Sequence, residues 1–193
     1  MKKRVELSQA VPVIMLILLM IGGAAASDSF FTVTNFSNIL QYAVESAFIA
    51  IGMTFVLLIG GIDLSVGSVM AFASVVAAKM ALEHMPLAAI LPVVLCIGIL
   101  CGAANGLIIT KLRVEPFMAT LAMMMVARGL ALIISDKASI TIANTGYKAI
   151  ARGEIIPGVA NAVLIFVVLT ILAPFLMNKT LLGRYSLAIG SNE

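Results

Sequence analysis

The chain has 193 residues, of which 62% are hydrophobic and 11% are charged, and its mean hydropathy is +1.17. Soluble domains average about 45–50% apolar and about 25% charged residues, so a soluble domain of this length could not bury so much apolar surface. Lipid must be the solvent for most of the chain, and the small, dispersed net charge of +3 argues against nucleic acid as a partner.

Apolar stretches near 20 residues predict an all-α, polytopic transmembrane helical bundle with about six spanning helices. Three basic residues at 2–4 place the N-terminus in the cytoplasm, and the basic residues of the later loops agree with this orientation. The first span also has the form of a cleavable signal peptide, because three alanines at 24–26 follow its apolar core. Polytopic proteins usually retain such a segment as a signal anchor, so cleavage is the alternative, and the later spans keep their orientation in both cases. The predicted spans are residues 10–27, 38–59, 66–82, 87–110, 117–135 and 159–177.

Two charges lie inside predicted spans, where an unpaired charge is expensive. Glu45 is seven residues in from the external end of the second span, and Arg128 is seven residues in from the external end of the fifth. At 1.5 Å per residue both lie roughly 10 Å below the outer surface. We expect either an ion pair between them, or a shared polar cavity. The alternative is a neutral Glu45 and an Arg128 that snorkels to the interface.

A polar, glycine-rich segment separates the second and third spans. It reads Gly-Gly-Ile-Asp-Leu-Ser-Val-Gly-Ser over residues 60–68, and nothing in it is needed merely to cross lipid. Either the carboxylate of Asp63 or the hydroxyl of Ser65 is predicted to cap the third span by accepting backbone N–H groups. The glycines would also allow backbone to line a cavity, with Asp63 holding the turn or contacting a partner. The residues of this hinge motif are Gly60, Gly61, Asp63, Ser65 and Gly67.

The fourth span carries a strip of glycines on one helix face. Gly98, Gly102 and Gly106 are spaced four apart, so a neighbouring backbone can approach them closely. Close helix packing is therefore predicted on this face, with the lining of a pathway as the alternative. Asn105 lies beside the strip and has an amide that can hydrogen-bond across it.

The hinge and several later motifs together resemble the signature of the ribose/xylose/arabinose-type permease subunits of bacterial ABC importers. The resemblance runs in order along nearly the whole chain, and it is specific to the family but not to one sugar. Its motifs are residues 51–56 and 60–68, Ala103-Ala104-Asn105-Gly106, residues 116–121, Ala127-Arg128-Gly129-Leu130 and residues 183–193.

The resemblance implies a permease of the bacterial inner membrane that pairs with a second permease subunit, identical or different. A periplasmic binding protein would deliver the sugar, and an ATP-binding subunit would hydrolyse ATP. The chain has no G-x-x-x-x-G-K-[ST] phosphate loop, so neither enzymatic activity nor a cofactor is expected in it. Residues 180–193 are expected to form the cytoplasmic loop that docks the ATP-binding subunit. The docking residues would be Gly183, Arg184, Gly190 and Asn192.

A neutral sugar requires hydroxyl-binding groups rather than charges along its path, and the two intramembrane charges are kept as candidates beside them. The candidate pathway residues are Gln41, Glu45, Thr54, Asn105, Thr120 and Arg128.

Members of this family are longer, and the chain ends directly after Asn192-Glu193 of the expected docking loop. We therefore expect a single permease domain over residues 1–193, truncated at its C-terminus. An inactive permease fragment is one alternative function. A secondary sugar transporter is another, although it would not need the docking loop. An intramembrane enzyme is disfavoured, since no span carries a histidine pair, a Ser/Lys dyad or paired aspartates at catalytic spacing.

Overall fold

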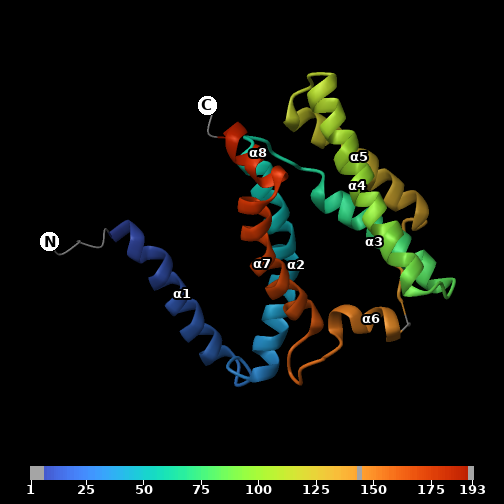
Figure 1. Cartoon of the computed structure of the whole chain (residues 1–193). Coiled ribbons are helices and arrows are strands. Elements are labelled where there is room, and N and C mark those ends of the chain that lie inside the picture. The colour runs from blue at the N-terminus through green and yellow to red at the C-terminus, as the bar shows by residue number, and fades with distance from the viewer. Residues whose placement is uncertain (1–6, 143–144, 191–193) are drawn as a thin grey trace.

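The structure is a computed structural model that describes residues 7–142 and 145–190, and these residues form eight α-helices (Figure 1). Four of the helices, α2, α4, α5 and α7, are long and apolar enough to cross a bilayer, and the segment Val11–Ala26 of α1 and the helix α3 are shorter apolar segments. The predicted fold class, a helical polytopic membrane protein, is confirmed. The helices are α1 (Leu7–Ala26), α2 (Val33–Leu58), α3 (Val66–Leu82), α4 (Leu87–Lys111), α5 (Pro116–Ile134), α6 (Thr145–Arg152), α7 (Asn161–Lys179) and α8 (Leu181–Gly190).

Each of the six predicted spans corresponds to one helix, but α6 and α8 were not predicted. Both are too short to be found by a search for 20-residue apolar stretches. Residues Leu181–Gly190 form a helix, so the expected docking loop is not a loop over these residues. Its role in docking stays a prediction.

The helices form two packed groups joined by the segment between α2 and α3. In the first group α3 packs against α5 and α4, and in the second α2 packs against α7 and α8 (Figure 1). The buried residues of α3 and α5 are mostly alanines, including Ala77 and Ala127 at 1% exposure each, and these let the two helices approach closely. An ion pair of 3.4 Å between Lys79 and Asp136 joins the C-terminal ends of α3 and α5.

The short helix α6 makes contact with both groups. It packs against α7, and its Tyr147 lies against the buried cluster of Ala77, Ala81 and Ile90 in α3 and α4. In Figure 1 it lies across the space between the two groups, at the end opposite to the α2–α3 segment, while α1 lies apart from both.

The glycine strip of α4 does not pack against another helix within the described residues. A methyl group added at Gly98, Gly102 or Gly106 would meet no atom within 4 Å. The prediction of close packing on this face is therefore wrong for the described structure. The reason is that the close approach is made by alanines of α3 and α5, while α4 turns Gly98 and Gly102 towards a cavity.

Candidate functional site

The helix α2 ends in a hydrogen-bonded turn that requires glycine. Gly60 has a φ of 72°, a left-handed conformation that favours glycine. The N–H of Gly61 donates to the carbonyl of Val56, and the N–H of Gly60 donates to that of Leu57, each over 3.0 Å. This is the Schellman pattern of a helix C-terminus. The turn ties both glycines to the last turn of α2.

Asp63 caps the start of α3, as one of the predicted alternatives states. Its Oδ1 atom accepts the backbone N–H of Ser65 at 2.8 Å and the hydroxyl of Ser65 at 2.6 Å. The other alternative, a cap made by the Ser65 hydroxyl, is not observed, because this hydroxyl donates to Asp63 instead. A carboxylate acceptor makes such bonds short and strong.

Two buried side chains from other helices hold the same segment in place. Asn105 of α4 donates from Nδ2 to the Ser65 hydroxyl over 3.1 Å and is 5% exposed. Thr120 of α5 is 2% exposed, and its hydroxyl lies 3.2 Å from the carbonyl of Ile62 and 2.8 Å from that of Pro116. The hydrogen bonds from Asn105 and Thr120 attach residues 62–65 to the group of α3, α4 and α5.

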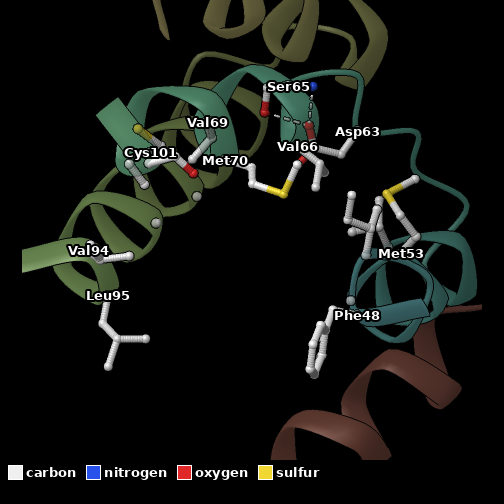
Figure 2. A pocket seen from close by; sticks show the side chains of 17 residues that line it. Phe48, Met53, Asp63, Ser65, Val66, Val69, Met70, Val94, Leu95 and Cys101 are labelled. Carbon is white, nitrogen blue, oxygen red and sulfur yellow. Dashed lines mark hydrogen bonds between the residues drawn. The ribbon is translucent and has the colours of Figure 1, made fainter. Parts of the chain in front are cut away.

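A cavity of about 780 Å³ opens between the two helix groups beside this segment. Figure 2 shows Asp63 and Ser65 at one end of it, with Phe48 of α2 and Leu95 of α4 on opposite sides. Its lining is mostly apolar, and Asp63 and Ser65 of the hinge are its polar groups at that end. The remaining residues named in Figure 2 are Met53, Val66, Val69, Met70, Val94 and Cys101, and the α4 wall includes Gly98 and Gly102.

The six candidate pathway residues do not lie along one path. Asn105 and Thr120 are bonded at the hinge and are buried away from the cavity surface. Thr54 is exposed, and its hydroxyl donates to the carbonyl of Ala50 within its own helix. Arg128 is exposed on α5. Their role in a pathway stays a prediction.

The remaining two candidates, Gln41 and Glu45, line a second cavity of about 260 Å³ between α2 and α6. The basic side chain at this cavity is Arg152, not Arg128. Among the described residues the ion pair closer than 4.0 Å is that of Lys79 with Asp136, so the expected pair of Glu45 with Arg128 is not formed. The two residues belong to helices that pack in different groups.

The helix α8 lies directly on the end of α2. At Gly190 an added Cβ would collide with the carbonyl oxygen of Leu58, and at Gly183 with the backbone of Met177. Both glycines therefore allow close backbone contact, one with α2 and one with α7. Arg184 is exposed on α8, and Asn192 lies outside the described residues.

Sequence reasoning missed two parts of this arrangement. It did not foresee that Asn105 and Thr120 hydrogen-bond to the hinge, and it left Arg152 out of the candidates. The signal for Arg152 lay in the short stretch 145–152. Its basic and apolar residues are spaced so that they fall on different faces of a helix. Within the described residues no group of three or more His, Cys, Asp or Glu side chains could hold a metal ion.

The helices and the hinge define a multi-pass helical membrane protein with a cavity between two packed groups. Residues 35–193 match the family described as branched-chain amino acid transport system / permease component, and the chain belongs to this family. It is 38% identical to the ribose import permease protein RbsC of Haemophilus influenzae over 187 residues, which cover 93% of this chain and 57% of the relative. It is also 39% identical to RbsC of Bacillus subtilis over 190 residues, which cover 94% of this chain and 57% of the relative.

A further relative is the galactofuranose transporter permease protein YtfT of Escherichia coli, 38% identical over 155 residues, covering 80% of this chain and 45% of YtfT. The chain spans about half the length of the curated relatives it matches. No solved structure matches it.

Proposed function

We propose that this chain is the membrane-spanning permease subunit of an ATP-driven importer that translocates a monosaccharide. The observation that carries the proposal is the position of the 780 Å³ cavity between two helix groups, beside the short hinge that leads from α2 to α3. A path between two groups that shift as units is what alternating access requires. The relatives named for ribose and galactofuranose support a sugar as the cargo.

The partners follow from this proposal. An ATP-binding subunit would dock at α8, a periplasmic binding protein would deliver the sugar on the opposite face, and a second permease subunit would complete the membrane part. The contact of Gly190 with the Leu58 carbonyl supports α8 as the docking element, because it joins α8 to the end of α2 beside the hinge. The N-terminus and the hinge would lie on the cytoplasmic side of the inner membrane.

Co-purification tests the docking directly. The tagged chain is co-expressed with the ATP-binding subunit of a ribose-type importer, extracted in mild detergent and recovered by its tag. We expect the ATP-binding subunit in the eluate, and we expect Arg184→Glu, a change on the exposed surface of α8, to remove most of it. Lys148→Glu on α6 makes the same change of charge on the opposite face and should leave recovery unchanged.

Two results would contradict the proposal. One is a chain that never retains the ATP-binding subunit, and the other is ribose uptake into proteoliposomes that runs on an ion gradient without ATP. The second result would favour a secondary sugar transporter, for which α8 has no docking role.

A further inference from the structure

We propose that the cavity between α2 and α6 is an entry site for a neutral polyol, held by Gln41, Glu45 and Arg152. This inference rests on the proposed function and adds the place where a released monosaccharide first binds the permease. The cavity measures about 260 Å³ and is separate from the larger cavity at the hinge, although Phe48 borders both.

The local fold brings Arg152 to α2 through a set of loop hydrogen bonds. The side chain of Asn161, the first residue of α7, donates to the carbonyl of Ala149 in α6 over 2.8 Å. The backbone N–H of Asn161 also donates to the carbonyl of Gly153 over 2.7 Å. These bonds fix the C-terminal end of α6, which carries Arg152, against the start of α7.

A second set of contacts fixes α2 against the same loop. The hydroxyl of Ser37 in α2 lies 3.4 Å from the carbonyl of Gly158, and the rings of Phe48 in α2 and Phe166 in α7 meet edge to face with centroids 6.0 Å apart. The two helices that form the walls of the cavity are therefore held in place by contacts within the protein.

The polar groups at this cavity match the hydrogen-bonding pattern of a sugar. The guanidinium of Arg152 offers only donors, the carboxylate of Glu45 offers only acceptors when ionised, and the amide of Gln41 offers both. Each hydroxyl of a polyol is both a donor and an acceptor, so neighbouring hydroxyls can satisfy a carboxylate and a guanidinium at once. Asn38 and Tyr42 add an amide and an aromatic face.

The size of the cavity agrees with a small ligand. At about 30 Å³ for each water molecule in the liquid, 260 Å³ corresponds to roughly nine waters, which is the scale of a molecule with about ten non-hydrogen atoms. A pentose falls in this range. An inorganic anion would leave most of the space to water and would face the carboxylate of Glu45.

The depth of the residues explains why charged groups are present here. The helix α2 has 26 residues and is about 39 Å long, about 9 Å more than the hydrocarbon thickness of a bilayer. If the excess lies at its N-terminal end, Gln41 lies just inside the hydrocarbon boundary and Glu45 a turn deeper. A carboxylate at this depth needs a polar cavity rather than lipid beside it.

The experiment measures D-ribose binding to the full chain in lipid nanodiscs by a saturation-transfer NMR titration. We expect Arg152→Gln and Glu45→Gln each to weaken ribose binding at least about tenfold, because each removes a charge-assisted hydrogen bond. Lys148→Gln is the matched control, since it removes one positive charge one turn earlier on the same helix and does not line this cavity. All variants are first checked for an unchanged helix content by circular dichroism.

Three results would overturn the inference. They are wild-type protein that binds no ribose, equal binding by Arg152→Gln and Lys148→Gln, and displacement of ribose by sulfate but not by D-xylose. The third result would identify an anion site. None of them decides the proposed function, because co-purification with the ATP-binding subunit tests that separately.

Discussion

Replacing Ser65 with alanine should break the attachment of the hinge to α4. The hydroxyl of Ser65 donates to Asp63 over 2.6 Å and accepts from Asn105 over 3.1 Å, so its removal cuts two hydrogen bonds at once. Asn105 is 5% exposed, and its Oδ1 atom already has no hydrogen-bond partner. In the Ser65→Ala protein the whole Asn105 amide would be left unpaired in the interior.

The size of the effect follows from these two losses. A hydrogen bond to a charged group contributes about 1.5–3 kcal/mol, and an orphaned buried donor costs about 1–3 kcal/mol. Hydrogen bonds between helices in a bilayer average only about 0.6 kcal/mol, so the lower ends of these ranges apply. We expect Ser65→Ala to lower the free energy of unfolding by about 2–3 kcal/mol. Asn105→Ala should lower it by at most about 1 kcal/mol, because it also removes the unpaired Oδ1 atom.

The double-mutant cycle is the decisive measurement. Unfolding is followed by far-ultraviolet circular dichroism in mixed micelles of increasing denaturing detergent, for the wild type, both single variants and the double variant. The orphaned amide disappears in the double variant, so its loss of stability should be smaller than the sum of the single losses by about 1 kcal/mol or more. Additivity within about 0.3–0.5 kcal/mol would show that the two side chains are independent and would refute the network.

Three further substitutions test the glycines, each by a different measurement or control. Gly60→Ala should lower the free energy of unfolding by about 1–2 kcal/mol in the same detergent assay, because Gly60 has a φ of 72°. Gly67→Ala is the control and should not lower it, because an added methyl group there meets no atom within 4 Å. Gly102→Ala should raise the unfolding midpoint, since alanine is favoured over glycine in a helix by about 1 kcal/mol and the new methyl group meets no atom within 4 Å. A lower midpoint would show that another helix does pack closely on the glycine face of α4. Gly190→Ala should displace α8 and speed hydrogen exchange over residues 181–190, and unchanged exchange would refute its close contact with Leu58.

The spans of this protein could be predicted because a bilayer imposes a length and a composition on any helix that crosses it. The third helix illustrates this, since residues 66–82 were expected and Val66–Leu82 is observed. The helix α6 does not cross the bilayer by its length, so the same argument could not predict it. It is an eight-residue helix whose position depends on contacts with α7 and on Tyr147 packing against α3 and α4, which are distant in sequence.

At the hinge, too, contacts between neighbouring residues could be predicted from the sequence, and contacts between distant residues could not. The cap made by Asp63 was predictable because the carboxylate and the N–H that it accepts are two residues apart. The partners of this segment were not, because Asn105 lies 40 residues beyond Ser65 and Thr120 lies 58 residues beyond Ile62. The polar character of Asn105 and Thr120 was visible in the sequence, but their role depends on which helices meet, and the packing of α3 against α4 and α5 decides that.

The hydrogen bonds also locate the joint between the two helix groups more closely than the sequence does. Gly61 is still bonded to Val56 and so belongs to α2, whereas the Ile62 carbonyl meets Thr120 and so belongs with α5. The change from one group to the other therefore falls at the link between Gly61 and Ile62, although the glycine-rich sequence spans nine residues. The contact of α8 with Leu58 lies on the α2 side of this link. A displacement of α8 would therefore act first on the group of α2 and α7. The larger cavity is walled by α2 on one side and by α3 and α4 on the other, so its width is what such a displacement would change.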